Sequence, residues 1–282
     1  MRLDWLLGGR IIYGGAVLAF GVVCLVYVDF VNSLQPVPEW LPGYDILAVV
    51  TGLVFAAGGA ALLAGWRMVP AGLAVAGLFA SWIVLLHVPW AFAEPAQLRS
   101  PFWIRVFESL SLAGAAIILA GVAGDRPRWV RLGRQAFGIS LPVFGILHFI
   151  YPESVAALVA VSPVAWPWPL AWAWLTGAGH FAAGIAVLTG SWARLAALLA
   201  GAMYASWVFT LHLPRIVGDL APASAEFPVG YQGNRPELTS LFVCIAFWGA
   251  AWLVAGTLGQ RPAAAAVEPA DSATGSGQQV FR

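Results

Sequence analysis

The segment GRIIYGGAVLAFGVVCLVYVD, residues 9–29, decides the fold of this chain. None of the residues between Arg10 and Asp29 is charged. A helix of about 20 apolar residues, rising roughly 1.5 Å per residue, crosses the hydrocarbon core of a bilayer. The segment is therefore expected to be a transmembrane helix. It is not expected to be a cleaved signal peptide, because its upstream part is short and no small-residue cleavage site follows it.

Seven further segments share this length and apolar character. The eight expected transmembrane helices run near residues 11–28, 46–65, 69–92, 104–123, 135–151, 168–189, 192–213 and 237–258. Hydrophobic residues make up 61% of the chain and charged residues 10%, whereas a soluble domain has roughly 25% charged residues. This composition excludes a soluble enzyme, a disordered chain and a nucleic-acid-binding protein, and it makes the lipid bilayer the expected partner.

The chain aligns with itself. Three pairs of segments match: residues 9–29 with GRQAFGISLPVFGILHFIYPE at 133–153, ASWIVLLHVP at 80–89 with ASWVFTLHLP at 205–214, and GAAIILAG at 114–121 with GAAWLVAG at 249–256. The offsets are 124, 125 and 135, so the second copy is longer in its last outer loop. Such self-similarity indicates an internal duplication.

Each repeat is expected to hold four helices. An even number of spans returns each repeat to the side where it began, so the repeats are predicted to be parallel, about an axis along the membrane normal. The expected parts are a first repeat at 1–124, a basic cytoplasmic linker at 125–134, a second repeat at 135–258 and a disordered cytoplasmic tail at 259–282. The predicted fold class is an all-α membrane protein with eight transmembrane helices as two parallel four-helix repeats.

The placement of arginine predicts the orientation, because basic loops stay in the cytoplasm. One set of loops holds ten of the 14 basic residues: Arg2, Arg10, Arg67, Arg126, Arg128, Arg131, Arg134, Arg194, Arg261 and Arg282. Both termini are therefore expected in the cytoplasm. The opposite loops hold most of the acidic residues, together with segments rich in proline and tryptophan.

Several loose motifs recur along the first repeat. Gly9-Arg10 opens the first span, PEWLPGYD at 38–45 leads into the second, GAALLAG at 59–65 ends the second, and GAAIILAG at 114–121 closes the fourth. In these features the four-helix unit resembles the DoxX family of small bacterial membrane proteins, over about residues 9–258. The resemblance implies a bacterial inner membrane. Through the DoxD-like subunit of thiosulfate:quinone oxidoreductase, it also implies a quinone-linked redox role with a soluble or membrane partner subunit. No family catalytic motif maps onto particular residues.

All four histidines lie in apolar spans, where an ionisable side chain is costly and marks a candidate functional residue. His87 and His212 occupy the same repeat position, His148 aligns with Cys24, and His180 lies deeper in the sixth span. A neutral histidine can ligate a metal or haem, pass a proton or hydrogen-bond a quinone. We therefore take His87, His212 and His148 as catalytic candidates and His180 as a binding candidate.

A structural interpretation of His87 and His212 is the favoured alternative. Each histidine precedes a proline, Pro89 or Pro214, and proline leaves a backbone carbonyl without its helical donor. The imidazole could donate to that carbonyl and so stabilise the helix. Metal binding is not expected, because no two histidines stand three or four residues apart on one helix.

Acidic residues follow the histidines in register. Glu94 and Asp219 lie seven residues after His87 and His212 and are further binding candidates. If the helices of both repeats face a common interior, these groups and the other histidines would form one pseudo-symmetric polar ring. Glu237 opens the last span, where the helix dipole explains an acidic residue.

Arg105 and Glu108 are binding candidates of a different kind. They lie three residues apart at the outer start of the fourth span, on one helical face, and are predicted to pair. The pair could recognise a substrate or handle protons, or it could be an ion pair that snorkels to the membrane surface. The aligned residues of the second repeat are Ser240 and Val243, so a site built on this pair would be confined to one half.

Two functions remain open, and mass spectrometry of the gently purified protein distinguishes them. A membrane redox component would carry stoichiometric quinone, haem or metal, and would lose activity in His87→Ala and His212→Ala. A non-catalytic module that binds or transports a small lipophilic molecule, or scaffolds a complex, would carry only lipid. Finding lipid alone, or no bound molecule, would contradict a tightly held cofactor.

Overall fold

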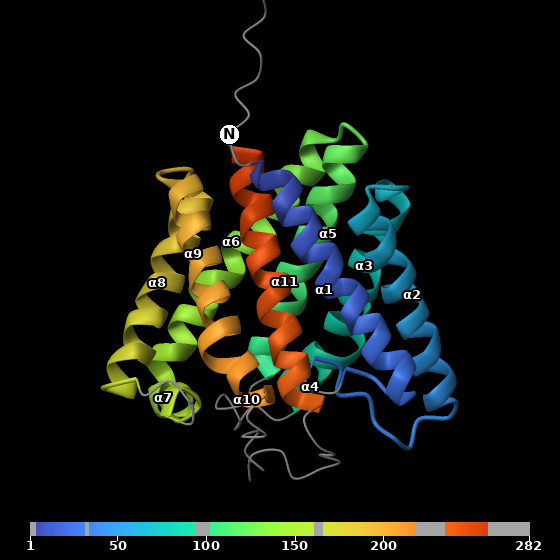
Figure 1. Ribbon diagram of the computed structural model, residues 1–282, viewed down its shortest axis with the longest axis horizontal. Helices are drawn as coiled ribbons and strands as arrows, with labels where there is room; N and C mark the ends of the chain where they lie inside the picture. The colour runs from blue at the N-terminus through green and yellow to red at the C-terminus, as the bar shows by residue number, and fades with distance from the viewer. Residues whose placement is uncertain (1–3, 32–33, 94–101, 161–165, 218–234, 259–282) are drawn as a thin grey trace, which may run out of the picture.

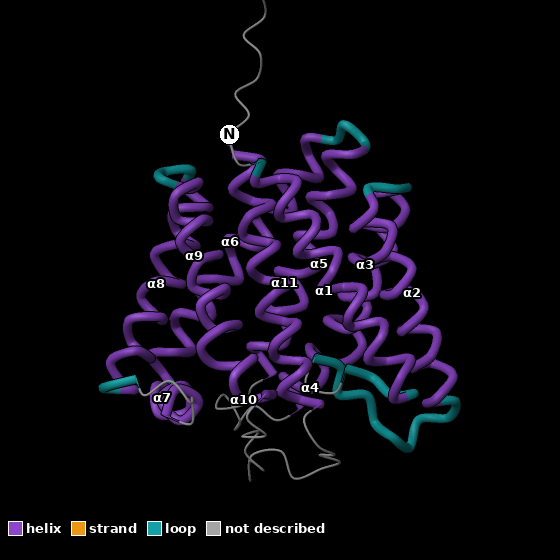
Figure 2. The backbone as a smooth tube through the Cα atoms, viewed as in Figure 1, coloured by secondary structure: helices purple, strands orange, loops and turns teal. Residues whose placement is uncertain are grey.

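The computed structural model describes residues 4–31, 34–93, 102–160, 166–217 and 235–258. Over these residues the chain consists of helices joined by turns and loops, with no β-strand (Figure 2). The all-α fold class is therefore confirmed for the described part of the chain. The binding candidates Glu94 and Asp219 and the predicted tail at 259–282 lie outside it.

The described helices fall into two sets. The first half comprises α1 (Trp5–Tyr27), α2 (Tyr44–Ala64), α3 (Met68–Trp82), the π-helix η1 (Ile83–His87), α4 (Val88–Ala93) and α5 (Phe102–Ala123). The second half comprises α6 (Pro127–Ile150), α7 (Pro152–Ala160), α8 (Pro169–Thr189), α9 (Ala193–Trp207), the π-helix η3 (Val208–His212), α10 (Leu213–Val217) and α11 (Arg235–Leu258).

Seven of the described helices are long and apolar enough to cross a membrane, where α3 and α9 are counted with the short helices that continue them. An eighth is reached if α6 and α7, which meet at an angle of 87°, are counted as one broken span. These numbers indicate a multi-pass membrane protein. The expected spans agree with the helices to within a few residues, except that α1 begins at Trp5 instead of near residue 11 and α6 at Pro127 instead of near residue 135. Hydropathy detects only the apolar part of a helix, and the first turns of α6 are rich in arginine.

The helices run between two ends of the molecule (Figure 1). The N-terminus lies at the same end as the short connections from α2 to α3, from α5 to α6 and from α8 to α9. The short helices α4, α7 and α10 lie at the opposite end, which we call the far end. Helices α1 and α6 therefore run in the same direction, from the N-terminal end to the far end.

The spans form a ring in chain order. Each packs on the next, from α1 through α2, α3, α5, α6, α8 and α9 to α11, and α11 closes the ring on α1. Helices α5 and α11 also touch each other across the middle, and they are the two most buried spans. The first helix of each half thus packs on the last helix of the other half, so the halves are interlocked rather than placed side by side as separate bundles.

Glycines bring the backbones together at both junctions between the halves. A Cβ atom on Gly9 of α1 would lie 2.7 Å from the backbone nitrogen of Leu253 and 2.9 Å from the carbonyl oxygen of Gly249, both in α11. At the other junction, a Cβ atom on Gly114 of α5 would lie 2.7 Å from the carbonyl oxygen of Gly133 in α6. Because these neighbours are backbone atoms, no side chain can turn aside to make room.

Three pairs of corresponding elements in the two halves have the same length. Helices α2 and α8, α3 and α9, and the π-helices η1 and η3 are each related by an offset of 125 residues. Helices α2 and α8 both end at a glycine with positive φ, Gly65 at 72° and Gly190 at 82°. This left-handed conformation favours glycine and lets the chain turn sharply into the next helix.

The two π-helices have a common cause in the proline that follows each of them. Pro89 and Pro214 lack a backbone N–H, so the regular hydrogen-bond ladder is interrupted there. The N–H of Val88 instead donates to the carbonyl of Ile83, five residues earlier, and Leu213 and Val208 form the equivalent bond. The wider π-helical turn accommodates the interrupted hydrogen-bond ladder within the helix.

We expect Gly9→Ala to destabilise the fold, because the added methyl group would overlap the backbone of α11 and overpacking typically costs about 1–3 kcal/mol. Gly15→Ala on the same helix is the matched control, since a Cβ atom there meets no other atom within 4 Å. Thermal unfolding of the purified protein in one detergent measures both variants. Equal melting temperatures would contradict a tight junction between α1 and α11.

Candidate functional site

Four rings from three helices of the second half form a contact cluster. His180 of α8 lies at its centre, with ring centroids 5.8 Å from Phe144, 5.5 Å from Tyr204 and 5.7 Å from Trp207. Tyr204 and Trp207, both on α9, lie 5.5 Å apart. The cluster places two hydrogen-bonding side chains, His180 and Tyr204, inside an aromatic shell within an apolar bundle.

The first half has the same cluster without the polar groups. At the aligned positions stand Phe20, Phe55, Phe79 and Trp82. Phe55 takes the central place, with ring centroids 5.8 Å from Phe20, 5.3 Å from Phe79 and 5.2 Å from Trp82. The first half is thus an apolar core, whereas the second half has a histidine where Phe55 stands and a tyrosine where Phe79 stands.

A cavity of about 110 Å³ lies against the polar cluster. We call it the histidine cavity. It is lined by Ile104, Glu108, Phe144, Leu147, His148, His180, Tyr204, Trp207, Val243, Cys244 and Phe247. These residues come from α5, α6, α8, α9 and α11, so four elements of the second half and the last helix of the first half build it.

Both histidines of the cavity are oriented by the backbone of their own helix. The Nδ1 atom of His148 lies 2.7 Å from the carbonyl oxygen of Phe144, and that of His180 lies 2.9 Å from the carbonyl oxygen of Thr176. A carbonyl only accepts hydrogen bonds, so each Nδ1 carries the hydrogen and donates it. The two rings lie 5.0 Å apart, centroid to centroid.

A hydrogen bond joins α8 to α9 beside the cavity. The Nε2 atom of His180 lies 3.0 Å from the hydroxyl oxygen of Tyr204. His180 is almost fully buried, and an imidazolium at such a site would be costly without a carboxylate partner. In the neutral ring Nε2 is an acceptor, so Tyr204 donates to it.

The predicted pair of Arg105 and Glu108 is confirmed. The Nη1 atom of Arg105 lies 2.6 Å from the Oε2 atom of Glu108, and both side chains are largely buried. Glu108 lines the histidine cavity, whereas Arg105 is an electrostatic neighbour of His87 in the first half. The pair therefore connects the interiors of the two halves.

His212 is the centre of a second polar cluster. Its Nδ1 atom lies 2.6 Å from the Oε1 atom of Glu237, which also lies 3.3 Å from the Nη1 atom of Arg215. Cys244, which lines the histidine cavity, is an electrostatic neighbour of His212. Two expectations are thereby corrected. His212 pairs with a carboxylate and not with a carbonyl freed by Pro214, and Glu237 neutralises a buried arginine in addition to opening a helix.

His87 has a different environment from its aligned partner. It is fully buried, and no described residue gives either of its ring nitrogens a hydrogen bond of normal geometry. Its polar neighbours are the backbone of Leu34 and the guanidinium of Arg105. The expected bond to a carbonyl freed by Pro89 is not formed, because η1 absorbs the interruption. Trp90 stands where the second half has Arg215.

The histidines therefore do not play equivalent roles. The structure brings His148 and His180 together at the histidine cavity, links His212 to it through Cys244, and leaves His87 in the other half. Within the described residues no group of three or more His, Cys, Asp and Glu side chains could hold a metal ion. The histidine and tyrosine side chains at the cavity can form hydrogen bonds and exchange protons.

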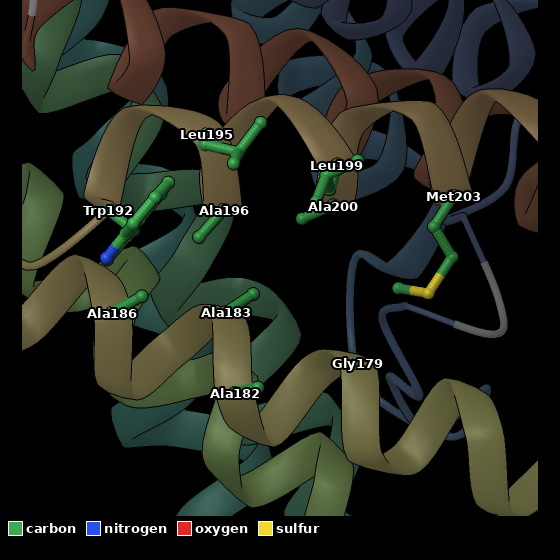
Figure 3. Close-up of a pocket in the computed structure, with 10 residues that line it drawn as sticks. All are labelled: Gly179, Ala182, Ala183, Ala186, Trp192, Leu195, Ala196, Leu199, Ala200 and Met203. Atoms are coloured by element: carbon green, nitrogen blue, oxygen red, sulfur yellow. The ribbon is translucent and has the colours of Figure 1, made fainter.

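An apolar crevice of about 350 Å³ separates α8 from α9 (Figure 3). Its walls are mostly small side chains, with Trp192 at one end and Met203 at the other. The lining residues are Gly179, Ala182, Ala183, Ala186, Trp192, Leu195, Ala196, Leu199, Ala200 and Met203. In the first half, larger side chains stand at two of the aligned positions, Val54 for Gly179 and Val75 for Ala200, and smaller ones stand at others, among them Gly58, Pro70 and Ala74.

Sequence inspection did not select Tyr204, Arg215 or Cys244 as site residues, and it explained Glu237 by the helix dipole alone. A signal was present for three of them in the self-alignment. Tyr204, Arg215 and Cys244 replace Phe79, Trp90 and Ser109 of the first repeat. Tyr204 and Arg215 stand out because a polar side chain occurs where the aligned residue is aromatic, and Cys244 because a thiol occurs where the aligned residue is a serine.

We expect Glu237→Gln to destabilise the protein by about 3–5 kcal/mol, because it leaves the buried Arg215 without a counter-charge. The double variant Arg215→Met, Glu237→Gln removes both charges and should recover much of that loss. Thermal unfolding of the single and double variants in the same detergent measures the difference. A double variant no more stable than Glu237→Gln would contradict the ion pair.

Comparisons of the chain with protein-family models, with curated proteins and with solved structures found no match. The site is therefore interpreted from its own geometry.

Proposed function

We propose that this protein binds a membrane-soluble molecule made of a small hydrogen-bonding ring and an apolar tail, of the quinone and quinol class. The single observation that carries the proposal is the histidine cavity, a mainly apolar, partly open space whose wall carries a few polar atoms among aromatic rings. Ligand sites in proteins are typically apolar cavities with a few convergent polar groups.

The size of the cavity is consistent with a single six-membered ring. A dry cavity of roughly 150 Å³ in another protein holds benzene, and the histidine cavity measures about 110 Å³. Small side-chain movements would therefore admit one substituted ring. The aromatic shell of Phe144, Trp207 and Phe247 offers stacking surfaces, while His148 and Tyr204 offer hydrogen-bonding atoms.

The α8–α9 crevice is suited to an apolar tail. Its lining residues Gly179 and Met203 directly precede His180 and Tyr204, which line the cavity. A tail in the crevice would therefore end beside the hydrogen bond that joins the two helices. Trp192 stands at the opposite end of the crevice, at the turn between α8 and α9 near the N-terminal end of the molecule.

We also propose that the two halves arose by duplication and that they are arranged in parallel. Equal element lengths at an offset of 125, two π-helices and two matching aromatic clusters support it. The contacts between the long helices also correspond in the two halves. For example, the contact of α1 with α11 corresponds to that of α6 with α5. In this scheme the second half kept or acquired the site, while its counterpart in the first half is filled.

The proposed orientation places the N-terminal end in the cytoplasm of a bacterial inner membrane. The turn from α5 to α6 lies at that end, and Arg126 in this turn with Arg128 and Arg131 at the start of α6 make it basic, as the positive-inside rule requires. Glu108 near the start of α5 and His148 near the end of α6 lie towards the far end. The cavity would thus lie in the outer half of the bilayer.

The quinone-linked redox role implied by the resemblance to the DoxX family is compatible with this binding site. The residues on the cavity wall supply hydrogen bonds and proton acceptors. Electrons would come from a partner subunit docked at the membrane surface. Binding without redox chemistry, for transport or storage of the same molecule, is the alternative that the site supports equally.

We expect His180→Phe and Tyr204→Phe to weaken binding of decylubiquinone or its quinol at least about tenfold, because each removes part of the polar wall. Both substitutions install the residue of the aligned position in the first half, Phe55 or Phe79, so the fold should tolerate them. Phe79→Tyr is the matched control and should leave binding unchanged. Isothermal titration calorimetry on the full chain in nanodiscs measures the affinities.

Unchanged affinities in both second-half variants, with normal melting temperatures, would contradict the histidine cavity as the binding site. Loss of binding in Phe79→Tyr as well would point to the first half instead.

A further inference from the structure

The polar atoms of the histidine cavity are mainly hydrogen-bond acceptors. His148 and His180 each direct Nδ1–H to a backbone carbonyl of their own helix, at 2.7 and 2.9 Å. In a neutral imidazole the remaining nitrogen, Nε2, has a lone pair and no hydrogen. Each ring therefore presents an acceptor on the edge opposite its own helix.

The hydroxyl group of Tyr204 does not add a free hydrogen-bond donor to the cavity. Tyr204 donates its hydrogen to the Nε2 atom of His180, 3.0 Å away. Its donor is therefore used, and only its oxygen lone pairs remain for another partner. The same bond occupies the Nε2 acceptor of His180, so the Nε2 atom of His148 is the histidine acceptor left for a ligand.

The remaining polar groups of the cavity also contribute mainly hydrogen-bond acceptors. Glu108 is an ionised partner of Arg105, and a carboxylate only accepts hydrogen bonds. The Nη1 donor of Arg105 is directed to that carboxylate at 2.6 Å. The indole N–H of Trp207 is a donor that both halves possess, since Trp82 stands at the aligned position. The polar groups that occur only in the second half therefore add hydrogen-bond acceptors to the cavity.

We infer that the histidine cavity selects the hydroxyl-bearing form of its ligand, a quinol or a related phenol, over the corresponding quinone. This inference rests on the proposed function and deepens it by naming the ligand form. A quinone carbonyl can only accept, so it would face the Nε2 lone pair of His148 and leave that acceptor unpaired. A phenolic hydroxyl donates to such an acceptor, and sites built this way discriminate strongly against ligands that lack the donor.

His148 is the specificity-determining residue in this arrangement. Its ring lies beside that of His180, with centroids 5.0 Å apart, and its Nδ1–H is anchored by Phe144. The aligned residue of the first half is Cys24, a much weaker acceptor. Replacing the imidazole should therefore remove the preference for the hydroxyl form while leaving the aromatic shell in place.

The experiment compares three probes that differ only in the oxygen substituents: decylhydroquinone kept reduced, its dimethyl ether, and decylquinone. Isothermal titration calorimetry on the full chain in nanodiscs gives their affinities. We expect the hydroquinone to bind at least about tenfold more tightly than either of the others. The dimethyl ether is the control for size and redox state, since it keeps the ring and tail but has no donor.

Variants of His148 test the assigned acceptor. His148→Leu should reduce the preference for the hydroquinone to less than about threefold, whereas His148→Gln, whose amide oxygen is an acceptor, should retain more of it. Ile146→Leu is the matched control, because it lies on an exposed side of the same helix. Melting temperatures measured in parallel identify any variant that fails to fold.

The outcomes separate the inference from the proposed function. Equal or tighter binding of the quinone would overturn the selection of the hydroxyl form while leaving a quinone site in place. An unchanged preference in a folded His148→Leu variant would overturn the role of His148. Failure of all three probes to bind the unmodified protein would overturn the proposed function itself.

Discussion

The close approach of helix backbones at glycine residues is the constraint on which the rest of this structure depends. In a bilayer, lipid tails are as apolar as the protein interior, so helices gain little by hiding apolar side chains. Packing contacts must hold them together, and these are best where no Cβ atom intervenes. Gly9 with Gly249, and Gly114 with Gly133, provide such contacts at the two places where one half meets the other. Through them, the last helix of each half becomes part of the wall of the other.

This interlocking explains how two similar halves can differ in their interiors. Because α5 and α11 are shared across the middle, Glu108 from the first half reaches the histidine cavity of the second. The aromatic scaffold is the same in both halves, and it holds its shape whether the central ring is Phe55 or His180. Polar groups could therefore be introduced into one half without disturbing the fold. The other half remains a filled core that supports the shared helices.

The polar clusters also show how the charge of a buried arginine is neutralised in the interior of this protein. Arg215 is almost completely buried and shares Glu237 with His212, so the one carboxylate serves a cation and an imidazole. Arg105 is held in the same manner by Glu108 one turn away. Both arginines therefore have an acidic partner within hydrogen-bonding or ion-pairing distance. The neutral His180 ring at the cavity needs none, because its two nitrogens are satisfied by the Thr176 carbonyl and the Tyr204 hydroxyl.

The amino-acid sequence by itself determined the membrane class, the positions of the spans and the pairing of Arg105 with Glu108. Span length and composition are properties of one segment, and residues three apart on a helix are neighbours whatever surrounds them. Only the tertiary structure decided that His180 meets Tyr204 and that His212 meets Glu237, 24 and 25 residues away along the chain. The helices are apolar on the lipid side and the inner side alike, so their sequences do not reveal which face turns inward. That choice is made by the packing of one helix on another, and it creates the site.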